Sequence, residues 1–196
     1  MKRTIQLTTP LATLLIATLA CNMPGPRLGG PERPPQAAAA STESLDSFND
    51  KWRDLNLDTP AGPFSMTFTE AELSSALDEA IQQAEADRGE NIPVSNPSVV
   101  LADGVINLYG QVSLNAFQAD GLIVAIPTIG PDGLIDIQIS AVEFGPIEID
   151  PALLDELVTS IERSINAPIQ SSPFNITLTT ITIADGLMTV EGTIEP

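Results

Sequence analysis

The sequence contains the same β-hairpin pattern twice, and this repetition limits the folds that the chain can adopt. Residues 99–112 read VVLADGVINLYGQV, and residues 180–194 read TITIADGLMTVEGTI. In both segments apolar and polar residues alternate on either side of an Asp-Gly pair, which is a preferred pair for a two-residue type I′ turn. The pattern therefore predicts two antiparallel strand pairs, each with one apolar face.

The turn position also predicts the register of each hairpin. In the first copy, Leu101 should lie opposite Ile106; in the second, Ile183 should lie opposite Met188. Asp103 and Asp185 are expected to be turn residues, because neither copy has the ligand spacing of an EF-hand calcium loop.

An amphipathic helix is predicted in front of each hairpin. The first begins with a capping box formed by Thr69 and Glu72. Its apolar stripe is Leu73, Ala76, Leu77, Ala80, Ile81 and Ala84. The second helix should begin at Asp150-Pro151 and end at Pro168. Its stripe is Leu154, Leu157, Val158, Ile161 and Ile165.

Two further strands are expected between the first hairpin and the second helix, at residues 121–128 and 133–144. The latter places Ile135, Ile137 and Ile139 on one face. The order of elements is then α-β-β-β-β-α-β-β over residues 64–196. This order predicts an α+β domain in which an antiparallel meander sheet of about six strands packs on two amphipathic helices.

The N-terminal third is predicted to lie outside this domain. Residues 1–20 have the basic start and short apolar run of an export signal. Cys21, the one cysteine of the chain, directly follows the small residue Ala20 at the end of the apolar run, which resembles the lipobox of bacterial lipoproteins, although Thr18 stands where that motif usually has Leu and Thr18 and Ala20 equally suit ordinary signal-peptide cleavage. Residues 21–63 are rich in proline, alanine and polar residues, which predicts a disordered tether. A short helix around residues 45–55, docked on the domain, is the alternative for that part of the tether.

Composition excludes several functional classes. The chain has 26 Asp and Glu, 8 Lys and Arg, no histidine and a formal net charge of −18. Such a negative protein repels phosphate backbones, so nucleic acid is not expected as a partner. The absence of histidine excludes Ser-His-Asp and Cys-His catalysis as well as His-based zinc sites. We therefore expect no catalytic residues, no metal and no cofactor, with a carboxylate-based hydrolase as the minority alternative.

Residues 64–196 resemble the small bacterial members of the tubular lipid-binding (TULIP-like) superfamily, which include the LmeA-type and YpmS-type envelope proteins. The resemblance rests on the order of the elements and on four segments: TEAEL at the first helix, LYGQV after the first turn, FGPIEIDPALLDEL before and in the second helix, and ITIADGLMTVEG near the end. It implies a curved antiparallel sheet that cradles a helix, with lipid acyl chains in the groove between them.

The resemblance also implies which residues would contact lipid. They are apolar and lie on the helices and on the sheet: Leu73, Leu77, Ile81, Leu101, Ile106, Leu108, Ile135, Ile137, Ile139, Leu154, Leu157, Val158 and Ile161. The scarcity of basic residues disfavours anionic headgroups. The expected protein is a lipoprotein anchored through Cys21 on the extracellular or periplasmic side of a membrane, with a lipid or another apolar ligand as its partner. The alternative is a structural or adaptor domain whose apolar residues form a solid core and which binds another envelope protein.

Overall fold

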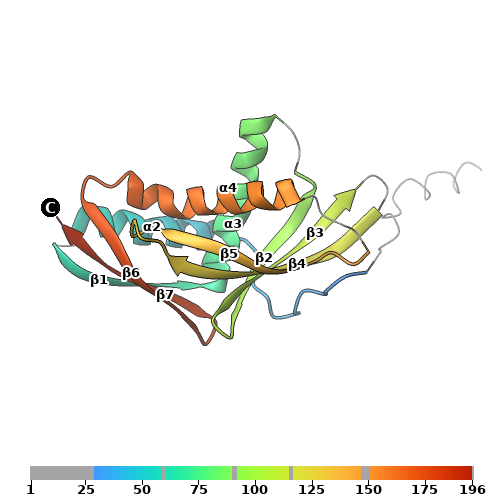
Figure 1. The fold of residues 1–196 in the computed structure, drawn as a ribbon, viewed down its shortest axis with the longest axis horizontal. Helices are drawn as coiled ribbons and strands as arrows, with labels where there is room; N and C mark the ends of the chain where they lie inside the picture. Colours follow the sequence, from blue (N-terminus) through green and yellow to red (C-terminus); the bar gives the residue numbers. More distant parts are fainter. Residues whose placement is uncertain (1–28, 59–60, 90–91, 115–116, 147–150, 196) are drawn as a thin grey trace, which may run out of the picture.

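The structure, a computed structural model, describes residues 29–58, 61–89, 92–114, 117–146 and 151–195. This part of the chain forms an α+β fold, as predicted, with three helices and seven strands (Figure 1). In chain order the elements are α2 (Thr42–Asp58), β1 (Gly62–Thr69), α3 (Glu70–Arg88), β2 (Val94–Ala102), β3 (Val105–Leu114), β4 (Phe117–Ile129), β5 (Ile135–Glu143), α4 (Pro151–Gln170), β6 (Asn175–Ala184) and β7 (Leu187–Glu195). The predicted signal peptide and Cys21 lie outside the described residues.

The strands form two antiparallel sheets where the sequence predicts one. One sheet has the order β2-β3-β4-β5, and the other has the order β1-β7-β6. The additional strand, β1, was not predicted; it alternates buried Met66 and Phe68 with exposed residues and pairs with β7 along its whole length. The two sheets adjoin where the backbone N–H of Leu178 in β6 donates to the carbonyl of Gly133, just before β5. All three helices lie on the same side of these sheets (Figure 1).

Both hairpins have the predicted register. Leu101 pairs with Ile106 in the first hairpin, and Ile183 pairs with Met188 in the second. Asp103 and Asp185 have φ values of 54° and 53°, and the glycine after each also has a positive φ. These are the dihedrals of type I′ turns, so the two aspartates have the turn role that the sequence assigns to them.

The predicted helices are present, with one difference at the end of α4. Thr69 and Glu72 form the expected capping box at the start of α3. The end predicted at Pro168 is wrong, because α4 continues to Gln170 with the proline in its last turn. The helical bond from Ser171 N–H to the Ala167 carbonyl, at 2.9 Å, still forms beyond the proline. A proline this close to a helix end removes only one intrahelical donor, which the short remainder of the helix tolerates.

Side chains of α3 complete the backbone hydrogen bonds of one edge of the four-stranded sheet. Among the described residues, no strand pairs with the outer side of edge strand β2. Instead, Leu101 N–H donates to Glu70 Oε1 at 2.8 Å, and Val99 N–H donates to Ser74 Oγ at 2.8 Å. These bonds satisfy edge donors that would otherwise be available to another chain.

Helix α4 covers the opposite edge, strand β5, in the same way. The side-chain amide of Asn166 accepts from Ile135 N–H at 3.0 Å and donates to the Ile135 carbonyl at 2.9 Å. Glu162 Oε1 accepts from Ile137 N–H at 2.8 Å. The two predicted helices therefore close the two edges of one sheet and bring their apolar stripes over its face.

Helix α2 belongs to the core, although the sequence analysis places its residues in a disordered tether. Phe48, Trp52 and Leu55 are buried in the same cluster as Phe68 of β1. The rings of Phe48 and Trp52 lie 5.2 Å and 5.7 Å from that of Phe68, between centroids. The possible helix at residues 45–55 is thus longer than expected, and it docks, because Phe48, Trp52 and Leu55 fall on one face.

Candidate functional site

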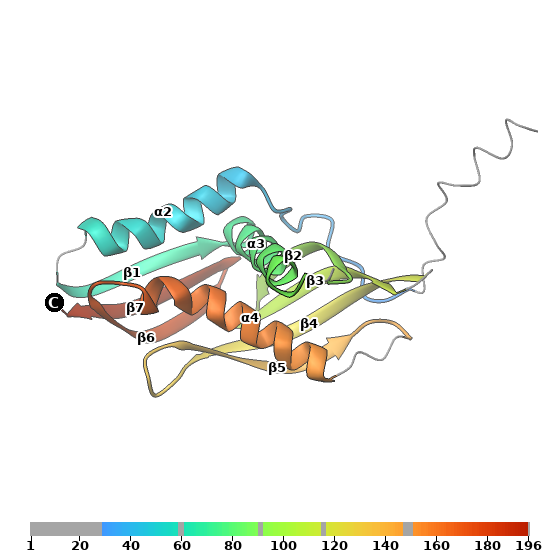
Figure 2. The ribbon, with the colours of Figure 1, turned by 90° about the horizontal axis from the view of Figure 1, so that it is seen from above.

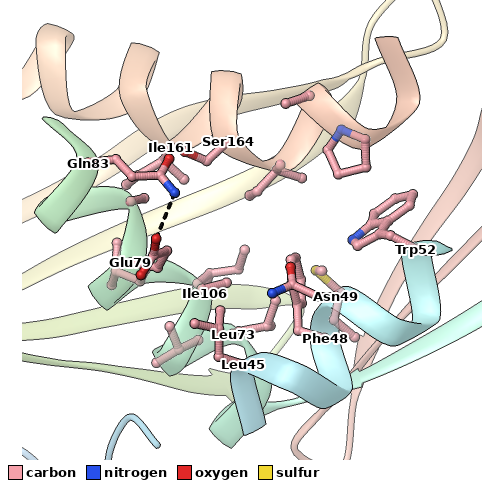
Figure 3. A pocket seen from close by; sticks show the side chains of 18 of the residues that line it. Leu45, Phe48, Asn49, Trp52, Leu73, Glu79, Gln83, Ile106, Ile161 and Ser164 are labelled. Carbon is pink, nitrogen blue, oxygen red and sulfur yellow. Dashed lines mark hydrogen bonds between the residues drawn. The ribbon is translucent and has the colours of Figure 1, made fainter. Parts of the chain in front are cut away.

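A groove of about 480 Å³ lies between the three helices and the sheets. Helices α2, α3 and α4 form its sides, and residues from β2 to β5 and from β7 form its floor (Figure 3). From above, α2 and α4 lie on either side of α3 (Figure 2). We call this cavity the main groove. Its volume falls within the range of about 300–1,000 Å³ that is usual for small-molecule sites.

The floor of the main groove is apolar. The sheets contribute Val99, Ile106, Leu108, Ala125, Ile137 and Met188. Apolar side chains of the helices add to this surface, among them Leu77 of α3 and Ile161 of α4. Such a floor offers no charged group to a ligand and favours a hydrocarbon chain over a polar metabolite.

Polar residues surround the opening of the main groove. Asn49 and Arg53 of α2, Gln83 of α3, and Ser171 at the end of α4 all line the groove and are exposed to solvent. Glu79 of α3 lies beside them and accepts a hydrogen bond from Gln83 Nε2 at 2.8 Å (Figure 3). We call Asn49, Arg53, Glu79, Gln83, Ser164 and Ser171 the rim.

A second, smaller cavity of about 40 Å³ continues from the main groove between α3 and α4. The two cavities share Ala80 and Ile161 as lining residues. The smaller one is lined almost wholly by apolar side chains, including Phe144 at the end of the four-stranded sheet. We call it the side pocket, and its position extends the apolar surface along α4.

The structure brings most of the residues implied by the family resemblance to these two cavities. Six line the main groove: Leu73, Leu77, Ile106, Leu108, Ile137 and Ile161. Three others line the side pocket: Ile81, Leu154 and Leu157. The remaining four line neither cavity. Leu101 and Ile135 are buried in the core, while Val158 and Ile139 are partly buried and pack against it.

The residues of α2 are the part of the site that sequence reasoning missed. Leu45, Phe48 and Trp52 line the main groove with their apolar side chains. Their signal is the spacing of Leu45, Phe48, Trp52 and Leu55, which recurs at intervals of three, four and three residues and marks one face of a helix. The proline- and alanine-rich residues before this stripe obscured it.

A polar cluster fixes α2 on the face away from the groove. Lys51 Nζ lies 2.7 Å from Glu72 Oε2 and donates to the Thr67 carbonyl at 2.6 Å. Ser47 Oγ donates to Glu72 Oε1 at 2.6 Å. Burial raises the pKa of Glu72, but the hydrogen bonds from Lys51, Ser47 and the Thr69 backbone, together with the charge of Lys51, outweigh this effect and hold the pKa below its ordinary value.

The described residues contain no group of three or more His, Cys, Asp or Glu side chains placed to hold a metal ion. In the same part of the chain, no helix has the length and the apolar character needed to cross a membrane. The groove itself presents a single carboxylate, Glu79, among its lining residues. The geometry is thus that of an open apolar groove with a polar rim.

A comparison of the sequence with protein-family models finds no match, and a comparison with curated proteins finds none either.

Proposed function

We propose that this protein is a surface-tethered bacterial lipoprotein that binds or transfers lipid acyl chains in its main groove. The observation that carries the proposal is the groove itself: about 480 Å³ of space with an apolar floor, open to solvent through a polar rim. The transfer of a hydrocarbon chain from water to such a surface lowers the free energy by roughly 25 cal/mol per Å² of apolar area buried.

The groove also bears on the alternative, a structural or adaptor domain with a solid core. The main groove is open to solvent, so without a ligand its apolar floor is in contact with water. A solid core would have no such surface, and leaving it in contact with water costs free energy that a bound hydrocarbon chain removes. This cost favours the lipid-binding hypothesis over the adaptor hypothesis.

The test uses the exported full chain with Cys21→Ser, so that any lipid found on it is not covalently attached. Trp52 is the single tryptophan of the chain and lines the groove, which makes it an internal probe. A monoacylglycerol with a brominated acyl chain should quench Trp52 emission at saturable concentrations. Native mass spectrometry should show the same protein carrying one lipid. No quenching and no bound lipid would exclude acyl-chain binding.

The anchor is tested separately on the wild-type chain. If Cys21 is lipidated, the mature protein partitions into the membrane fraction and incorporates radiolabelled palmitate, whereas Cys21→Ser does neither. A wild-type protein that is released in soluble form with a free Cys21 would refute the lipoprotein proposal and leave the lipid-binding proposal standing.

A further inference from the structure

The two charged residues of the rim, Arg53 and Glu79, already have partners. Arg53 Nη1 lies 2.7 Å from Asp50 Oδ1, and Arg53 Nη2 lies 3.6 Å from Asp54 Oδ1. Glu79 accepts from Gln83. The one guanidinium of the rim thus lies beside two carboxylates, and Glu79 adds a third carboxylate to the rim, within a protein whose net charge is −18. An anionic headgroup at this rim would meet an excess of negative charge.

The rim has hydrogen-bonding groups that suit an uncharged headgroup. Asn49 and Gln83 present side-chain amides, and Ser164 and Ser171 present hydroxyl oxygens. Pro168 has no N–H, so it cannot donate to the carbonyl of Ser164, one turn earlier in α4. The carbonyl oxygen of Ser164 is therefore a further acceptor. A headgroup with hydroxyl groups can donate to these oxygens and accept from the amides.

We propose that the main groove takes single-chain amphiphiles whose headgroup is uncharged and carries hydroxyl groups, such as a monoacylglycerol, in preference to the fatty acid of the same chain length. This inference rests on the proposed function, since it assigns the headgroup of a ligand whose acyl chain fills the groove. The charge at the rim distinguishes the monoacylglycerol from the fatty acid. The apolar floor does not, because both ligands have the same hydrocarbon chain.

The test compares monolaurin with laurate on the exported Cys21→Ser chain at pH 8, below the micelle concentration of each. Binding is followed through the emission of Trp52. We expect monolaurin to bind at least about tenfold more tightly than laurate, with the difference shrinking at high ionic strength. Equal affinities, or tighter binding of laurate, would overturn the inference. If neither ligand binds, the proposed function itself fails, and the two failures are distinguishable.

A pair of double variants distinguishes the effect of the charges beside Arg53 on ligand affinity from the effect of the net charge of the protein. The first variant, Asp50→Asn with Asp54→Asn, removes the two carboxylates that pair with Arg53. It should raise the affinity for laurate about fivefold, because an exposed charge contact contributes about that much. The affinity for monolaurin should stay within about twofold. Both carboxylates are at least half exposed, so we expect their replacement to change the unfolding free energy little.

The matched control is Asp103→Asn with Asp185→Asn, which changes the net charge equally. Both residues lie in hairpin turns with positive φ, where Asn is well tolerated. The control should leave the affinities for both ligands unchanged. If it raises the affinity for laurate as much as the rim variant does, selection comes from net charge and the assignment to the rim is wrong.

Discussion

Lys51 of α2 and Glu72 of α3 form an ion pair, with 2.7 Å between Nζ and Oε2, that joins the two helices. Glu72 also accepts from Ser47 of α2 and from the backbone of Thr69. One carboxylate therefore caps α3 and holds α2, and α2 in turn forms one side of the main groove. The ionised form of Glu72 thus helps to hold this side of the groove in place.

The first prediction concerns pH. The pKa of Glu72 in the folded protein is below its ordinary value, so the carboxylate stabilises the fold fully above the unfolded pKa of about 4.3, and this stabilisation is lost as the pH falls through the lowered folded pKa. We expect Glu72→Gln to lower the unfolding free energy by about 2 kcal/mol at pH 7 and by clearly less near pH 3. Urea denaturation followed by Trp52 emission measures both values.

The control for this prediction is Glu191→Gln, at an exposed position on β7. This substitution should change the unfolding free energy by no more than about 0.5 kcal/mol at either pH. A constant difference between wild type and Glu72→Gln across the pH range would contradict the prediction, because the loss would then not depend on the ionisation of Glu72.

A second prediction tests whether α2 is part of the folded domain. Phe48 of α2 is buried against Phe68, whereas Phe117 at the start of β4 has 46% of its surface exposed. Phe48→Ala should lower the unfolding free energy by about 3 kcal/mol, because it removes a buried ring and leaves a cavity. Phe117→Ala, the same chemical change, should cost less than about 1 kcal/mol. Equal effects in urea denaturation would contradict the docking of α2.

The features that could be predicted from the sequence are those that depend on neighbouring residues. The Asp-Gly turns set the register of both hairpins, and the capping box at Thr69 sets the start of α3. The pairing of β1 with β7 is different, since it joins Thr67 to Thr189 across 122 residues, and no local pattern encodes such a partner. The same holds for α2, whose stripe identifies a helix face but not the surface that covers it.

The site was predictable only in part, for a related reason. Alternation along a strand shows which side chains face inward, but not whether the space that they face is filled. Leu101 and Leu108 have the same pattern in one hairpin, yet Leu101 is 4% exposed and lies in the core, while Leu108 lines the main groove. The difference depends on where α3 lies over the hairpin, a position held by the hydrogen bonds of Glu70 and Ser74 to β2 and not readable from the strand pattern.

A third prediction concerns the edge bonds made by α4. Asn166 is buried and forms two hydrogen bonds with the backbone of Ile135. Asn166→Ala leaves the buried N–H and C=O of Ile135 without these partners, so we expect a loss of about 2–3 kcal/mol of unfolding free energy. The Ile135 amide should also exchange its hydrogen faster, as measured by NMR. Asn175→Ala, at an exposed position on β6, is the control and should change neither quantity appreciably.

The last prediction tests whether the main groove must be empty for a ligand to bind. Ala76 of α3 lines the groove and is half-buried, so the ring introduced by Ala76→Phe would occupy ligand space without entering the packed core. Ala86→Phe, two to three turns further along the same helix at an exposed position, carries the same helix-propensity cost and lines neither cavity. We expect Ala76→Phe to abolish the quenching of Trp52 by brominated monoacylglycerol and to change the unfolding free energy by no more than about 1 kcal/mol. Ala86→Phe should leave the quenching intact. Quenching that survives in Ala76→Phe would place the acyl chain outside the main groove, because the ring and the chain cannot share that space.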